Sequence, residues 1–73
     1  MGRLPALSSR DVIRALQRAG FVEDRQGGGH KILKKGSLRV TVPMHSRDLK
    51  KGTVQGIIEE AGLTVEEFVE HLR

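Results

Sequence analysis

Three histidines, a glycine-rich turn and a set of basic residues are the parts of this chain that could carry chemistry. The 73 residues include no cysteine, which excludes a thiol nucleophile, a disulfide and a thiolate zinc site. No serine, histidine and acidic residue have a spacing that suggests a nucleophilic triad. What remains is proton transfer by an imidazole, assisted by the positive charge of Lys and Arg.

His30 follows three consecutive glycines. Gly28 and Gly29 let a backbone approach a ligand closely and can present N–H groups to an anion. Cleavage of RNA by transesterification needs a group that takes the 2′-hydroxyl proton or protonates the leaving oxygen, together with cations that hold the charge developing on the phosphorane. His30 suits the first role. A hairpin turn followed by a surface histidine explains the same residues without chemistry, and the sequence leaves both interpretations open.

The cations that could hold a phosphate follow His30 in two groups. Those in the predicted strand and hairpin are Lys31, Lys34, Lys35 and Arg39. Those in the loop that leads to a predicted helix are Arg47, Lys50 and Lys51, and this loop also contains His45. First-turn N–H groups and the helix dipole favour anions at such a position, although a polar structural connection explains the loop equally well.

The other histidines suggest less. His71 falls in the last turn of a predicted helix, where the dipole favours a cation, so an exposed or capping role is expected. A zinc site made by His30 and His45 would lack the usual ligand spacing and a thiolate. We therefore expect no metal and no other cofactor.

The charge is unevenly distributed along the chain. Its formal net value is +4, but residues 1–58 carry twelve Lys or Arg against four Asp or Glu, a net +8, whereas residues 59–73 carry one against five, a net −4. A basic surface followed by an acidic segment is typical of polyphosphate binders, because neutralised phosphates release condensed counterions. A solvated lysine-rich surface without a partner gives the same balance.

Hydrophobic periodicity predicts the elements that position these residues. Apolar residues at helical spacing, a capping box formed by Ser8 and Asp11, and a stop at Gly20 predict a helix over 9–19, with Phe21 folding back on it. Glycine-separated runs then predict a three-stranded meander. Its strands are expected at 21–26, 30–35 and 38–43, the last two joined by the two-residue turn Gly36-Ser37. The alternation leaves open which face of the middle strand carries His30.

Two further helices are predicted after the meander. Val54, Ile57, Ile58 and Ala61 mark the first, closed by Gly62. Thr64 and Glu67 form a capping box for the second, which ends near Leu72. The expected fold is a two-layer α+β arrangement of α-β-β-β-α with an extra C-terminal helix. The apolar stripe of that last helix needs a partner, either the flank of the same domain or another chain.

The length allows one domain over residues 1–73, with a core at about 7–62 and the appended helix at about 64–72, and excludes a large enzyme with an enclosed cavity. No apolar run is long enough for a membrane span or a signal peptide. We therefore expect a cytoplasmic protein without membrane contact. The oligomeric state does not follow from the sequence.

Several stretches, taken in order, resemble the HicA (YcfA-like) toxin family over about residues 7–64. They are Ser-Ser-Arg-Asp-Val-Ile-Arg-Ala-Leu at 8–16, Ala19-Gly20-Phe21, the glycine turn into His30, Val40-Thr41-Val42-Pro43 with His45, and Leu49-Lys50-Lys51-Gly52-Thr53-Val54 through Ile57-Ile58 to Ala61-Gly62-Leu63. The resemblance implies a double-stranded-RNA-binding-like fold, ribonuclease activity on messenger RNA, and inhibition by a HicB-type antitoxin. The family's catalytic histidine starts the middle strand after a Gly-Ser pair, which maps it onto His30, with Gly29 in place of the serine.

The combined expectation is a metal-independent endoribonuclease toxin of low turnover with His30 as general acid/base. The residues expected to bind RNA phosphates are Gly28, Gly29, Lys31, Lys34, Lys35, Arg39, His45, Arg47, Lys50 and Lys51. A lysine, His45 or the substrate itself would act as the second acid/base. The alternatives are a non-catalytic RNA-binding module of the same fold and a protein-interaction domain whose basic face meets an acidic partner. The acidic third helix would repel RNA, so it is expected to be a packing or interaction surface.

Overall fold

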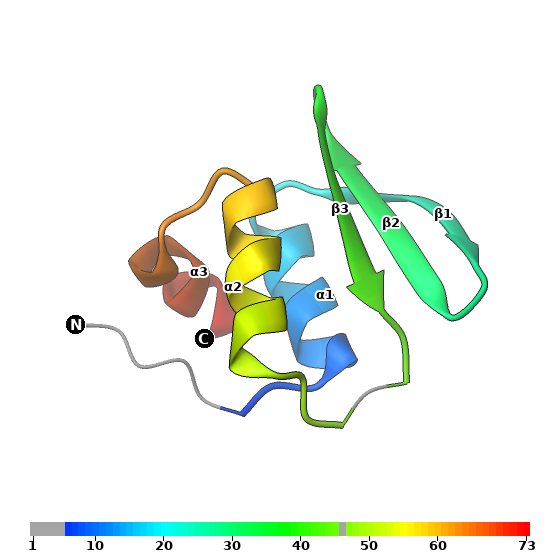
Figure 1. The fold of residues 1–73 in the computed structure, drawn as a ribbon. Coiled ribbons are helices and arrows are strands. Elements are labelled where there is room, and N and C mark those ends of the chain that lie inside the picture. The colour runs from blue at the N-terminus through cyan, green and yellow to red at the C-terminus, as the bar shows by residue number, and fades with distance from the viewer. Residues whose placement is uncertain (1–5, 46) are drawn as a thin grey trace.

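A three-stranded antiparallel sheet with helices gathered on one side forms the molecule (Figure 1). The computed structural model describes residues 6–45 and 47–73. The elements are α1 (Ser9–Arg18), β1 (Val22–Gly27), β2 (His30–Lys35), β3 (Leu38–Pro43), α2 (Lys51–Glu60) and α3 (Val65–Leu72). The predicted α+β order, α-β-β-β-α with an extra C-terminal helix, is confirmed.

Both ends of α1 are fixed by the predicted capping interactions. The Ser8 hydroxyl accepts a hydrogen bond from the Asp11 N–H at 3.2 Å, and the Asp11 carboxylate accepts from the Ser8 N–H at 3.2 Å. The Ser8 N–H and, at 3.0 Å, the Ser8 hydroxyl both donate to the Asp11 carboxylate, and these two bonds hold the pKa of that carboxyl below its usual value. At the other end, Gly20 has a φ of +104° and the Phe21 N–H donates to the Leu16 carbonyl at 3.0 Å, the pattern of a Schellman stop.

The order of the strands is β1-β2-β3, and glycines at positive φ make both connecting turns. Leu33, Val40 and Val42 are fully buried, so they define the face of the sheet that meets the helices. Alternation places Lys31 on this inner face and His30 on the outer face. The face of His30, which the sequence left open, is thereby settled. Every residue of β1, the strand farthest from the helices in Figure 1, is exposed.

The appended helix α3 packs against the flank of its own chain, mainly on α1. Its capping box, between Thr64 and Glu67, is present as predicted. Phe68 is fully buried in the core. The Arg18 guanidinium at the end of α1 donates to the backbone carbonyls of His71 and Arg73. Of the two partners expected for the apolar stripe of α3, the structure therefore provides the one within the chain.

Across the described residues, none of the helices combines the length and the apolar character that a membrane span requires.

Candidate functional site

His30 is the first residue of β2 and stands directly after the Gly28-Gly29 turn. Its side chain is exposed, and its Nδ1 atom lies 3.2 Å from the Gly28 carbonyl oxygen. The Gly29 carbonyl accepts a hydrogen bond from the Met44 N–H at 2.8 Å, so the turn is tied to the chain that leaves β3. The result is an accessible imidazole on a fixed strand end.

A shallow hollow lies beside His30, between β3 and α2. Thr41 and Pro43 line it from the strand, and Glu59 and Glu60 are among the α2 residues that line it. None of the described residues around this hollow is a lysine or arginine. The charged residues in the described lining of this hollow are thus the two glutamates, which belong to the last turn of α2.

The structure separates the four cations predicted next to His30. Lys34 and Arg39 face each other across the β2–β3 pair on the outer face, four residues from His30 along the strand and so about 13 Å away. Lys34 is also 3.6 Å from the Asp24 carboxylate. Lys31 lies on the inner face, where its ammonium group is 3.2 Å from Glu23.

Lys35 lies at the far end of β2. Its ammonium group donates to the Ala19 carbonyl at 2.7 Å and stands 6.0 Å from the centre of the Phe21 ring. This side chain therefore has a structural role at the end of α1. Only Lys34 and Arg39, of the four, share a face with His30.

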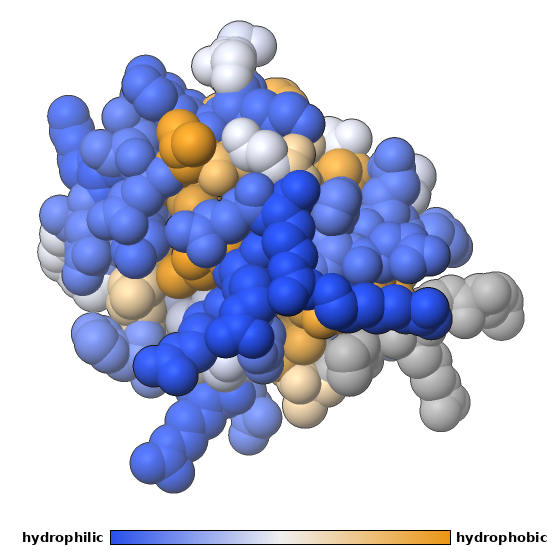
Figure 2. Space-filling model, turned by 180° about the vertical axis from the view of Figure 1, so that it is seen from behind, coloured by the Kyte–Doolittle hydropathy of each residue, from blue (hydrophilic) through white to orange (hydrophobic). Residues whose placement is uncertain are grey.

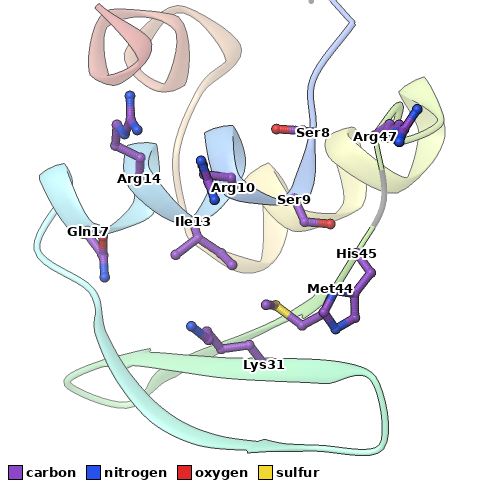
Figure 3. Close-up of a pocket in the computed structure, with 10 residues that line it drawn as sticks. All are labelled: Ser8, Ser9, Arg10, Ile13, Arg14, Gln17, Lys31, Met44, His45 and Arg47. Atoms are coloured by element: carbon purple, nitrogen blue, oxygen red, sulfur yellow. The ribbon is translucent and has the colours of Figure 1, made fainter.

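A basic groove runs between α1 and the start of β2, on the other side of the strand end from His30 (Figure 3). Its described lining residues are Ser8, Ser9, Arg10, Ile13, Arg14, Gln17, Lys31, Met44, His45 and Arg47, around a volume of about 940 Å³. Four of the ten are Lys or Arg, and none of them is Asp or Glu. His45 has a φ of +64°, an uncommon backbone conformation for a residue with a side chain.

Figure 2 shows the molecule from behind. Strongly hydrophilic side chains cross the middle of this face, over α1, with small hydrophobic areas between them. This is the face on which α1 presents its exposed residues to solvent.

Two groove residues, Arg10 and Arg14, were not among the predicted site residues. They are exposed and lie four positions apart on α1, beside the buried Ser9 and Ile13 that line the same groove. Their spacing could have predicted this shared position, because residues at i, i+4 and i+7 lie on one helix face and Gln17 continues the series. Lys50 and Lys51, at the start of α2, are exposed but do not line the groove.

No three side chains of His, Asp or Glu gather into a metal-binding group within residues 6–45 and 47–73. Glycines 28 and 29 are both open to solvent, and a Cβ atom on either would meet nothing within 4 Å.

A family model described as HicA toxin of bacterial toxin-antitoxin matches residues 9–63, from the start of α1 to just before α3. Among curated proteins, none matches the chain.

Proposed function

Since the chain belongs to the HicA toxin family of bacterial toxin–antitoxin systems, we propose that it is an endoribonuclease toxin that cleaves messenger RNA in the cytoplasm, with His30 as general acid/base. The observation that carries the proposal is the position of this histidine. His30 is exposed, starts the middle strand and follows a glycine turn that is tied to the end of β3. A substrate can therefore reach an imidazole that the fold holds in place.

The proposed chemistry needs no metal and no other cofactor. The 2′-oxygen of the RNA forms a bond to the neighbouring phosphorus, and the bond from phosphorus to the 5′-oxygen of the next nucleotide breaks. His30 either removes the 2′-hydroxyl proton or returns a proton to the leaving oxygen. A lysine, His45 or the substrate itself takes the other role, and a low turnover follows from this sparse set of groups.

Phosphate contacts are proposed for the glycine turn and for the predicted basic residues other than Lys35, whose ammonium group donates to the Ala19 carbonyl. Gly28 and Gly29 offer backbone without side-chain obstruction. Arg39 and Lys34 lie on the face of His30 and can hold the flanking backbone, and Lys50 and Lys51 stand at the start of α2. Because Gly29 replaces the serine common in the family, no hydroxyl assists at that position.

The test is induction of the chain in a bacterial host beside the His30→Ala variant, followed by cleavage assays on purified RNA. We expect growth arrest and RNA cleavage only with the unchanged chain. The circular dichroism of the variant should be unchanged, because an exposed side chain contributes little to packing. His71→Ala, on α3, is the matched control and should remain active. Full cleavage by His30→Ala would contradict the proposal, and loss of its fold would make His30 structural.

The proposed partner is an acidic HicB-type antitoxin. A basic surface is best covered by an acidic, partly apolar one that pairs the cations and excludes RNA. We expect competitive inhibition. When the complex forms, protection from amide exchange should increase at His30 and over 31–39, while that of 66–70 should not change. Protection confined to 64–73 would instead identify α3 as the docking element.

One observation favours a second candidate function. The hollow beside His30 contains two glutamates and, among the described residues, no Lys or Arg, which is unfavourable for a phosphorane. A non-catalytic RNA-binding module of the same fold fits this feature. Salt-dependent RNA binding without any cleavage would support that alternative.

A further inference from the structure

We propose that the basic groove between α1 and the start of β2 binds an unpaired segment of RNA through its phosphates, on the other side of the strand end from His30. The inference rests on the proposed function for its ligand, RNA, but places most of the affinity at residues that the family resemblance does not assign. Among the described residues, none lines both the groove and the hollow beside His30.

The arginines of the groove are accessible to a ligand, and the acidic neighbour of Arg10 and Arg14 is Asp11, whose carboxyl pKa they help to lower. Arg10, Arg14 and Arg47 are exposed, and none has a hydrogen bond or ion pair with another described residue. Arg18, on the same helix, is different because its guanidinium is engaged by the carbonyls at the end of α3. Guanidinium groups bind phosphate oxygens through two parallel N–H donors, so three unengaged ones around one groove favour a phosphodiester ligand.

The geometry of α1 makes these side chains a spaced array. Arg10 and Arg14 are one turn apart on a helix whose two ends are capped, with about 5–6 Å between their Cβ atoms. Figure 3 shows both on α1, across from Lys31 on β2, with the Arg14 side chain turned away from Lys31 toward α3. Neighbouring phosphates of one strand can be held by successive turns of such a helix.

The floor of the groove favours unpaired RNA over a duplex. The half-buried Met44, with a small contribution from Ile13, which is 8% exposed, provides an apolar surface between the cations. The chain has no Trp or Tyr, and both of its Phe residues are buried, so bases can stack on the exposed imidazole of His45, on guanidinium planes or on aliphatic side chains. A duplex keeps its bases stacked inside and presents a convex backbone, whereas an unpaired strand can turn a base toward this floor.

The groove ends next to the turn that carries His30. Met44 lines the groove, and its N–H donates to the carbonyl of Gly29, the residue before His30. An RNA strand held by the arginines would therefore leave the groove at the catalytic turn. This arrangement provides the positive charge that the acidic hollow lacks, and it makes Arg10 and Arg14 positioning residues for the reaction.

The test measures binding in the His30→Ala background, which keeps the RNA intact. A labelled unstructured RNA of about twelve nucleotides and a duplex of the same sequence are titrated by fluorescence anisotropy at several salt concentrations. Arg10→Gln and Arg14→Gln should each weaken binding of the single strand about 3- to 10-fold and lower the slope of log affinity against log salt by about 0.7. The matched control is Arg25→Gln, which removes one exposed charge from β1 and should change the affinity less than twofold.

Equal losses for Arg14→Gln and Arg25→Gln would show that the charge acts diffusely and would overturn the groove assignment. Tighter binding of the duplex would overturn the assignment to unpaired RNA. If the arginine variants keep their RNA affinity but lose affinity for an acidic antitoxin, the groove is a protein-binding surface instead.

If the chain with His30 intact cleaves RNA while the arginine variants bind and cleave normally, only the groove inference fails. If it neither binds nor cleaves RNA, the proposed function fails as well.

Discussion

Phe68 provides a direct test of what the helix beyond the family match contributes. The matched residues end at 63, and α3 begins at Val65. Phe68 is the one described residue of α3 that is fully buried. It belongs to the same core cluster as the buried residues of α1, α2, β2 and β3. Phe68→Ala therefore removes the main contact of α3 with the core while leaving its capping box in place.

The expected cost follows from the size of the buried ring. Burying an aromatic side chain removes about 150–250 Å² from water, which at about 25 cal/mol per Å² corresponds to about 4–6 kcal/mol. Measured truncations of buried Phe to Ala cost about 3–5 kcal/mol. A chain of 73 residues has about 4–11 kcal/mol of total stability at ordinary values per residue. Phe68→Ala should thus leave the folded state marginal at 25 °C.

The assay is urea unfolding followed by circular dichroism, with RNA cleavage measured at low temperature on the same preparations. We expect a loss of about 3–5 kcal/mol for Phe68→Ala and less than about 0.5 kcal/mol for Glu70→Ala, an exposed control on the same helix. At saturating RNA, cleavage per folded molecule should be unchanged. A loss below about 1 kcal/mol would refute the assignment of α3 to the core, and normal stability with lost antitoxin binding would make α3 an interaction element.

Three further predictions concern single side chains. His45→Gly should raise the free energy of unfolding by up to about 1 kcal/mol, because glycine adopts a φ of +64° without strain; a lower melting temperature would mean that the imidazole makes a stabilising contact. Ser8→Ala should cost about 0.5–2 kcal/mol at neutral pH. The Ser8 N–H and, next, the Ser8 hydroxyl lower the pKa of folded Asp11 below the usual 3.8, so their stabilisation is present above about pH 4 and is lost on acidification. The variant keeps the N–H and loses the hydroxyl, so the pH dependence of urea unfolding should flatten in part. Arg39→Gln should reduce the salt slope of RNA binding by about 0.7, and an unchanged slope would remove this residue from the contact surface.

The elements were predictable because each has a local cause in the sequence. The capping boxes at Ser8 and Thr64, the glycine stops and the glycine turns act within a few residues, so the pattern located α1, the three strands and α3 closely. For α2 it marked the apolar residues from Val54 and the stop at Gly62, whereas the helix begins at Lys51 without a side-chain cap. The partner of α3 was not predictable, because it depends on Arg18 meeting the end of α3 across more than fifty residues. The shift in the β1–β2 register between Glu23 and Arg25 was also not predictable, because no clear sequence pattern marks it.

The site was harder to predict for the same reason. Proximity in the chain suggested that Lys31 and Lys35 surround His30. Strand alternation places Lys31 on the opposite face, and Lys35 reaches back to the Ala19 carbonyl. Arg10 meets the start of β2 only in three dimensions. A list of neighbouring cations therefore overestimates the charge next to the imidazole and misses the charge on α1.

The packing of α3 and the arginine groove are connected through α1. The groove wall that carries Arg10 and Arg14 belongs to the helix on which α3 packs, and Arg18 of that helix binds the last carbonyls of α3. A phosphate site needs side chains held on rigid elements, because binding otherwise has to order them first. Although α3 is acidic and lies outside the groove lining, it can thus support RNA affinity by holding α1 in place. Weakening α3 should lower the affinity of the groove before it affects His30, which stands on a strand that α3 does not contact closely.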